Sequence, residues 1–200
     1  MRYKSVVAIL ACVCSLCGCS RVLHNAALVS SNPVLVRSAD PSHEFLATIH
    51  NKYTLRSLVN LRGQISKEER VFLEHHPDVL LHVFHWSAIQ KPPADDIDRL
   101  LALYRNPKSF PMIIHCRAGA DRTGLAIALY RIEIEGMDPA EAMTEMKFYR
   151  HIHFLYPAMQ SELNQRYGAS STARSLWANI KHLIKLPFTL MRNIVWDFDM

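Results

Sequence analysis

Strand-like and helix-like segments alternate through the middle of this 200-residue chain, and no other feature of the sequence restricts the possible folds so much. Short runs of apolar and β-branched residues predict buried strands at 34–36, 58–61, 79–86 and 110–114. A segment with apolar residues at helical spacing follows each run; these segments begin near Ser42, Ser66, Pro93 and Thr123. Alternating units of this kind predict an α/β fold, a central and mainly parallel sheet flanked by helices, in which ligands bind at the carboxyl ends of strands.

Composition limits the number of domains and the kind of partner. With half of its residues apolar and one fifth charged, the chain can bury one core but hardly two. The net charge of +5 includes Arg2 and Lys4, so a chain cut after residue 18 would carry +3. This charge is too mild for nucleic-acid binding, but it suits an anionic substrate. The eleven histidines form neither a His-Glu-x-x-His motif nor a set with paired cysteines, so the sequence predicts no metal site and no cofactor.

The first residues have the pattern of an export signal. Arg2 and Lys4 precede an apolar run at 6–16, which is too short to span a bilayer. The run ends in Leu16-Cys17-Gly18-Cys19, which resembles a bacterial lipobox, so Cys19 is the expected site of lipidation. An ordinary cleaved signal or an uncleaved anchor are the alternatives. We therefore expect an exported protein of the bacterial cell envelope, either a membrane-anchored lipoprotein facing the periplasm or a secreted protein.

These features divide the chain into four expected parts. They are an export signal at 1–19, a tether at 20–32, a folded domain at 33–168 and a basic, apolar helical tail at 169–200. The tail is divided by Pro187, and two readings of it stay open: it lies in a membrane interface, or it packs back onto the domain.

Cys116 stands apart from the other four cysteines. Cys12, Cys14 and Cys17 would leave with the signal and Cys19 would be acylated, so Cys116 would be the one free thiol of the mature chain. In an oxidising compartment a lone thiol is either buried and inert or present for its reactivity.

The sequence around Cys116 favours reactivity. A predicted strand ends at Ile114, a short loop contains Gly119, and a helix starts at Thr123. Backbone N–H groups at a helix N-terminus stabilise a thiolate and bind phosphoryl oxygens. We therefore expect a phosphate site that is formed by Arg117, Ala118, Gly119, Ala120, Asp121 and Arg122, beside the nucleophile Cys116. Arg122 would bind the phosphoryl group with two hydrogen bonds. Thr123 would donate its hydroxyl to the thiolate or in the phosphoenzyme step, and His115 would support the loop by hydrogen bonding.

The segment from His115 to Gly124 matches the pattern His-Cys-x5-Arg-Thr-Gly and resembles the protein-tyrosine and dual-specificity phosphatase superfamily, especially its atypical bacterial members. Weaker resemblance at 36–39 and 58–62 extends the likeness to about residues 33–160. The resemblance implies that 33–168 is a phosphatase domain that acts without a cofactor, through a cysteinyl-phosphate intermediate. It also implies a phosphorylated protein or a small phosphoester as the substrate, with phosphotyrosine the first expectation and dual specificity an option. Two alternatives are a phosphoinositide or inositol phosphate phosphatase, and a pseudophosphatase that only binds phosphorylated partners.

The sequence offers more than one candidate for the general acid. The resemblance implies an aspartate on the loop after an earlier strand, but the stretch from His85 to Pro93 contains none. Asp121 inside the loop is one candidate, although it could also only stiffen the turn. Asp95 and Asp96 are the alternatives, although acids in a first helical turn are equally explained by the helix dipole.

Overall fold

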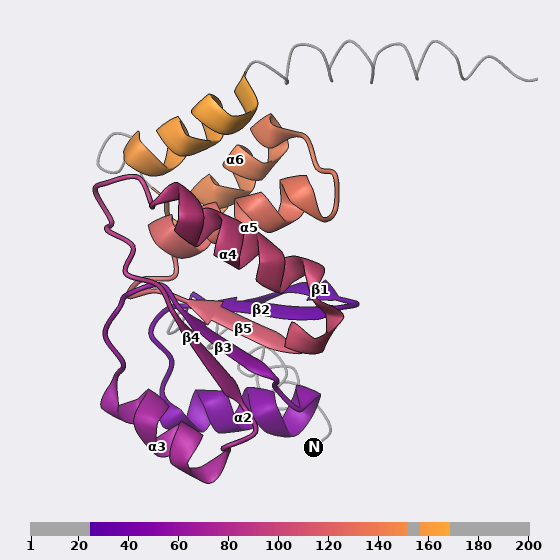
Figure 1. The fold of residues 1–200 in the computed structure, drawn as a ribbon, viewed down its shortest axis with the longest axis vertical. Coiled ribbons are helices and arrows are strands. Elements are labelled where there is room, and N and C mark those ends of the chain that lie inside the picture. The colour runs from indigo at the N-terminus through magenta and orange to yellow at the C-terminus, as the bar shows by residue number, and fades with distance from the viewer. Residues whose placement is uncertain (1–24, 152–156, 169–200) are drawn as a thin grey trace, which may run out of the picture.

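The computed structural model describes residues 25–151 and 157–168 and shows one five-stranded sheet between two layers of helices (Figure 1). The strand order is β1-β2-β5-β3-β4. The strands are β1 (Ala27–Ser31), β2 (Val34–Ser38), β3 (Ser57–Asn60), β4 (Leu80–Val83) and β5 (Met112–His115). The helices are α2 (His43–Tyr53), α3 (Lys67–His75), α4 (Ala94–Arg105), α5 (Asp121–Glu133) and α6 (Pro139–Phe148), with a short 3-10 turn at Pro107–Ser109 and a further helix at 157–168.

The sheet confirms the predicted α/β fold. β2, β5, β3 and β4 are parallel, and β1 alone is antiparallel to its neighbour β2. β1 also corrects the expected tether at 20–32, because residues 27–31 belong to the sheet. Small and polar residues made this segment look like a linker, yet Val29 points into the core and the backbone pairs with β2. The expected signal at 1–19, Cys19 and the tail at 169–200 lie outside the described residues.

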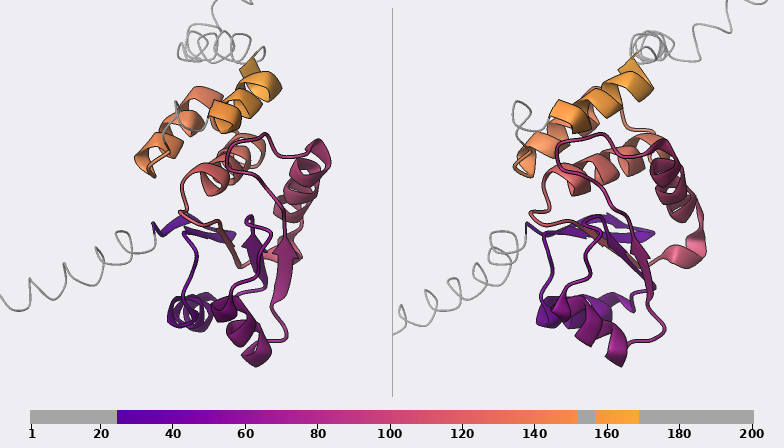
Figure 2. Two further views of the ribbon diagram at one scale, coloured as in Figure 1. Left: turned by 90° about the vertical axis from the view of Figure 1, so that its left-hand side faces the viewer. Right: turned by 60° about the vertical axis from the view of Figure 1, so that its left-hand side comes forward.

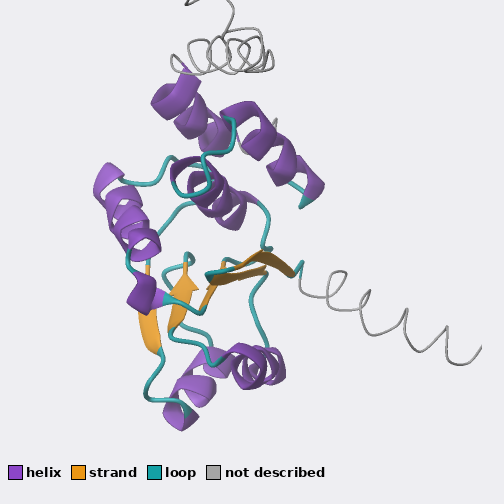
Figure 3. Cartoon of the chain, turned by 90° about the vertical axis from the view of Figure 1, so that its right-hand side faces the viewer, coloured by secondary structure: helices purple, strands orange, loops and turns teal. Residues whose placement is uncertain are grey.

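The two helical layers bury opposite faces of the sheet. α2 and α3 cover one face, and α4, α5 and α6 cover the other, as the turned views show (Figures 2 and 3). β5 lies in the centre and alternates between the two cores: Met112 and Ile114 pack toward α4 and α5, and Ile113 packs toward α2 and α3. Burial on both faces explains why this strand is a continuous apolar run in the sequence.

Two helices begin with side-chain caps at Ser42 and Ser66, the residues near which the sequence predicts their starts. The Ser42 side chain accepts a hydrogen bond from the Phe45 N–H, and Ser66 forms a full capping box with Glu69. α4 begins after Pro93 with no side-chain cap. Within the part of the chain that the structure describes, no helix combines the length and the apolar character needed to cross a membrane.

Candidate active site

The five residues between β5 and α5, 116–120, form a loop at the carboxyl end of the central strand, which we call the Cys116 loop. Cys116 directly follows β5, and its exposed fraction is only 2%. Asp121 begins α5, so the loop runs into a helix N-terminus, where unpaired N–H groups and the helix dipole favour bound anions. The predicted strand, loop and helix are therefore all present, in the predicted order.

Three successive carbonyl groups of the loop are bonded on its outer side. The Arg117 carbonyl accepts from the Asp40 N–H at 3.2 Å, the Ala118 carbonyl from Asn25 Nδ2 at 3.0 Å, and the Gly119 carbonyl from Arg37 Nη2 at 2.6 Å. In a planar trans peptide the N–H group points away from the carbonyl. The N–H groups that follow these carbonyls are thus turned toward the inner side of the loop, the arrangement that binds phosphoryl oxygens.

Gly119 is required by the geometry of this loop. Its φ is +65°, in the left-handed region that glycine adopts without steric cost. A Cβ atom there would lie 2.6 Å from the Ala39 nitrogen and 2.8 Å from the Ser38 carbonyl oxygen. The backbone of 38–39 therefore packs directly against the loop, and any side chain at position 119 would force this backbone to shift.

Arg37 is a site residue to which the sequence analysis gave no role. Its side chain is completely buried, and its guanidinium carbon lies 3.6 Å from the centre of the Tyr149 ring. Burial lowers the pKa of Arg37 to about 10, although the nearby Tyr149 and Glu145 oppose this shift. Arg37 is therefore still charged at neutral pH, and it donates a hydrogen bond to the Gly119 carbonyl on the outer side of the loop.

His115, which the sequence analysis expects to support the loop, lies directly before Cys116 in a buried polar network. Its ring is fully buried, with Nε2 at 3.0 Å from Glu69 Oε1 and Nδ1 at 3.7 Å from Asp40 Oδ1. Glu69 also accepts hydrogen bonds from the Asn60 amide and from the Ser66 N–H. Burial alone would raise the pKa of Glu69, but His115 and these hydrogen bonds outweigh it and lower the pKa. A buried polar network thus fixes the residue before Cys116.

Arg122 and Thr123 lie in the first turn of α5. Arg122 is half-buried and donates from Nη1 to the Trp86 carbonyl at 3.1 Å, which ties the segment after β4 to the site. Thr123 is fully buried, and its hydroxyl makes no hydrogen bond with any residue that the structure describes. Donation by this hydroxyl to the thiolate or in the phosphoenzyme step therefore stays a prediction.

The acidic candidates lie in two different places in the structure. Asp121 lies at the end of the Cys116 loop, and its Oδ1 is 2.6 Å from Nδ1 of His151. Asp95 is exposed at the start of α4, and the neighbouring Asp96 accepts a hydrogen bond from Arg99 at 2.8 Å. His151 follows the end of α6, thirty residues after Asp121, and no local pattern in the sequence reveals their contact.

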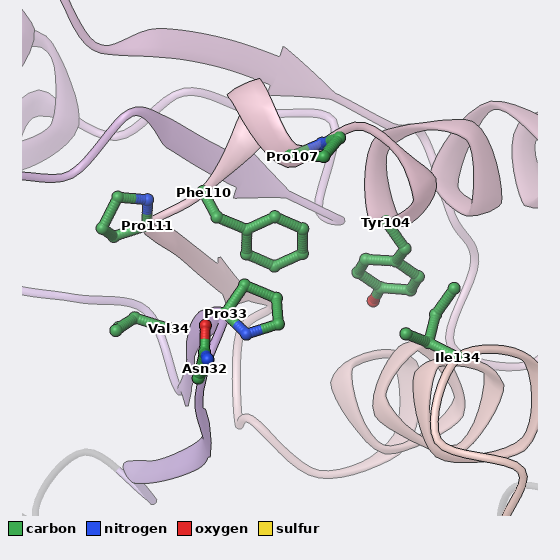
Figure 4. Close-up of a pocket in the computed structure, with 8 residues that line it drawn as sticks. All are labelled: Asn32, Pro33, Val34, Tyr104, Pro107, Phe110, Pro111 and Ile134. Atoms are coloured by element: carbon green, nitrogen blue, oxygen red, sulfur yellow. The ribbon is translucent and has the colours of Figure 1, made fainter.

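Two further features bear on ligand binding. Among residues 25–151 and 157–168, no group of three or more His, Cys, Asp or Glu side chains is arranged to hold a metal ion. A cavity of about 540 Å³ lies at the opposite, amino-terminal ends of β2 and β5, away from the Cys116 loop (Figure 4). Its lining is mostly apolar and consists of Asn32, Pro33, Val34, Tyr104, Pro107, Phe110, Pro111 and Ile134.

Comparison with known proteins gives concordant matches. A family model described as the tyrosine phosphatase family matches residues 23–160. The chain is 29% identical over 120 residues to the dual specificity protein phosphatase TpbA of Pseudomonas aeruginosa, strain PAO1. This match covers 60% of the chain and 53% of TpbA, so the chain spans about half the length of the curated relatives it matches.

Solved structures show the same likeness of fold. The crystal structure of P. aeruginosa TpbA is 24% identical with a TM-score of 0.54, and the match covers 66% of this chain and 80% of that one. A cysteine-to-serine variant of TpbA in complex with phosphotyrosine is 25% identical with a TM-score of 0.53, covering 64% and 77%. The core catalytic domain of the PP-IP phosphatase SIW14 from S. cerevisiae is 20% identical with a TM-score of 0.55, covering 68% and 87%.

Proposed function

This chain belongs to the tyrosine phosphatase family, and from that premise we propose that it hydrolyses phosphate monoesters, phosphotyrosine in proteins or peptides first among them, through a phosphoenzyme on Cys116. One observation carries the proposal. The Arg117, Ala118 and Gly119 carbonyls are all held on the outer side of the loop, which turns the following N–H groups inward beside Cys116. A phosphoryl group bound there would face the thiol at the N-terminus of α5.

The proposed reaction has two steps. In the first, the Cys116 thiolate attacks phosphorus; an S–P bond forms, the bond to the leaving oxygen breaks, and Asp121 protonates that oxygen. In the second, the Asp121 carboxylate takes a proton from water, whose oxygen attacks phosphorus; the S–P bond breaks and phosphate leaves. Arg122 binds the phosphoryl oxygens as charge develops on them, with two parallel hydrogen bonds that a lysine cannot form.

The relatives support phosphotyrosine as the substrate. TpbA is described as a dual specificity protein phosphatase, and a variant of it has been solved with phosphotyrosine. Ala120 occupies a loop position at which a cationic side chain would help to bind the additional phosphates of an inositol ring. A panel with a phosphotyrosine peptide, a phosphoserine peptide and a phosphoinositide under matched conditions tests this order. Equal or faster turnover of the phosphoinositide would contradict phosphotyrosine as the preferred substrate.

The activity itself is tested with the full chain and an aryl phosphate. Turnover that vanadate inhibits and that Cys116→Ser abolishes supports the enzyme. Binding of a phosphopeptide without turnover would instead support a pseudophosphatase. The absence of an aspartate between His85 and Pro93 motivates that alternative.

We also propose that the protein acts in the bacterial cell envelope and that Cys19 carries a lipid anchor. The apolar run at 6–16 and the sequence Leu16-Cys17-Gly18-Cys19 support this proposal. The protein should then partition with membranes, and Cys19→Ser should release it or block its maturation. An unmodified Cys19 in the mature chain, measured by intact mass, would contradict the anchor.

A further inference from the structure

The chain reverses direction directly after α6, and this turn faces the Cys116 loop. The His151 N–H donates to the Met146 carbonyl at 3.2 Å and the Arg150 N–H to the Lys147 carbonyl at 3.0 Å. Arg150 between them has a φ of +70°. These bonds form a Schellman motif, with an arginine at the position that is usually glycine. We call residues 149–151 the α6 turn.

The packing of α6 on α5 fixes where this turn lies. α6 runs back along α5, so that Met146 packs against Gly124 and Glu145 forms an ion pair with Arg131 at 2.8 Å. The end of α6 is thereby brought to the beginning of α5, where the Cys116 loop ends. Residues 149–151 are thus held beside the loop by the packing of α6 on α5.

The α6 turn reaches the loop region at three points. The Tyr149 ring stacks on Arg37, which donates to the Gly119 carbonyl. The Tyr149 carbonyl accepts from Asn25 Nδ2 at 3.1 Å, and the same amide donates to the Ala118 carbonyl. The third contact is direct and joins His151 to Asp121.

The contact between His151 and Asp121 is short and largely shielded from solvent. The His151 side chain is 0% exposed and that of Asp121 is 14% exposed, and their closest atoms are 2.6 Å apart. An unprotonated Oδ1 is only an acceptor, so the imidazole donates from Nδ1, and the acid proton of Asp121 is carried by Oδ2. A short, buried bond from a ring that cannot rotate freely restricts the carboxyl group to one orientation.

We propose that His151 is a positioning residue that holds the Asp121 carboxyl group in the orientation needed to protonate the leaving oxygen. This rests on the proposed phosphatase function and on Asp121 as its acid. His151 acts through Asp121 and does not itself touch the substrate. The α6 turn thereby connects the packing of α6 on α5 to the catalytic machinery.

The test compares two polar replacements of His151. The amide nitrogen of asparagine lies near the position of the imidazole Nδ1, whereas that of glutamine lies near the position of Nε2. His151→Asn should keep turnover of a phosphotyrosine peptide within a few-fold of the wild type, and His151→Gln should lower kcat about tenfold to a hundredfold, with little change in KM. His75→Gln is the matched control, because His75 is exposed on α3, where its ring bonds the Val71 carbonyl and contacts His43 of α2. It should leave kcat unchanged.

Leaving-group dependence separates positioning from a general structural role. His151→Gln should slow the turnover of phosphotyrosine more than that of an activated aryl phosphate. In the double variant with Asp121→Asn it should lower kcat by less than about threefold further, because both changes remove the same function. Thermal unfolding of each variant checks that the fold is kept. Wild-type kcat in a folded His151→Gln, or a fully additive double variant, would overturn the inference while leaving the phosphatase intact. An inert wild-type chain would overturn the proposed function and the inference together.

Discussion

At the scale of single residues, Gly119 is the position at which the Cys116 loop tolerates change least. Gly119→Ala introduces both a strained φ and a Cβ atom 2.6 Å from the Ala39 backbone. We expect the free energy of unfolding to fall by about 2 kcal/mol or more, and turnover to fall about a hundredfold, because the backbone N–H groups shift.

Gly136→Ala provides the control for this substitution. Gly136 has a similar φ of +71°, but a Cβ atom there would meet nothing within 4 Å. Only the cost of the left-handed conformation should remain, about 1 kcal/mol, with turnover unchanged. Urea unfolding and steady-state kinetics on the two variants measure both quantities. Equal losses of stability in the two variants would show that the contact with 38–39 is unimportant.

Asp121 is the second residue with a sharp expectation. Asp121→Asn should lower kcat for phosphotyrosine about a hundredfold or more, and much less for an activated aryl ester, because only the poor leaving group needs a proton. Asp96→Asn should change the free energy of unfolding by a few tenths to about 1 kcal/mol through the helix dipole, without leaving-group dependence. Rates for a series of aryl phosphates check this. The same loss for good and poor leaving groups would mean that Asp121 only shapes the loop.

The sequence predicts the residues of the Cys116 loop well and predicts poorly what holds them. Cys116, Gly119 and Arg122 lie within one short motif, so their juxtaposition follows from local geometry. Asn25 contacts this loop, and His151 contacts Asp121 directly after it, from positions far away in the chain. Such contacts depend on how strands and helices pack, and no local pattern encodes them.

At the scale of elements, the α6 turn contains a residue whose conformation is unfavourable. Arg150 is exposed and has a φ of +70° at the position after the helix cap. Arg150→Gly should raise the free energy of unfolding by about 0.5–1 kcal/mol, because the relief of strain exceeds the added entropy of the unfolded chain.

Arg150→Ala is the control, since it removes the same side chain but keeps the strained φ. It should not gain stability, and chemical denaturation of both variants at one pH makes the comparison. A gain of the same size in Arg150→Ala would assign the effect to the arginine side chain and not to the backbone.

The elements themselves differ in how well the sequence predicts them. The capped helices α2 and α3 and the continuous apolar strand β5 follow directly from local residues, and they are confirmed. β1 was wrongly expected in a tether, because a short edge strand with one inward apolar residue resembles a linker. Its pairing with β2 supplies the stabilisation that its composition does not show.

At the scale of the whole molecule, Glu69 connects one helical layer to the centre of the sheet. It caps α3, bonds Asn60 of β3 and meets His115 of β5, and all three side chains are buried. Its pKa is lowered from an ordinary value of 4.5. Near and below pH 4.5 the unfolded chain therefore binds a proton more readily than the folded chain does.

Stability from Glu69 is accordingly complete above about pH 4.5 and is lost as the pH falls through the lowered pKa of the folded state. Glu69→Gln should cost about 1–3 kcal/mol at pH 7, because hydrogen bonds to a charged group are lost. It should also flatten the decline in stability between neutral and acidic pH. Urea unfolding across that range measures both effects. A decline as steep in Glu69→Gln as in the wild type would assign the acid sensitivity to other carboxylates.

The overall architecture could be predicted because alternating strands and helices leave few ways to cover both faces of a parallel sheet. The position of the site followed as well, since the loop after the central strand must lie at the carboxyl edge. What could not be predicted is the network beneath this edge. Arg37, Glu69 and His151 are each explained only by partners that folding brings to them.

The central claim is that Cys116 carries the phosphoryl group during turnover. The full chain is mixed with excess p-nitrophenyl phosphate and quenched in acid, and its intact mass is measured, followed by peptide mapping. We expect the mass of one added phosphoryl group, located on the peptide that contains Cys116 and absent from Cys116→Ser. A phosphoryl group on another residue, or turnover that persists in Cys116→Ser, would contradict the account.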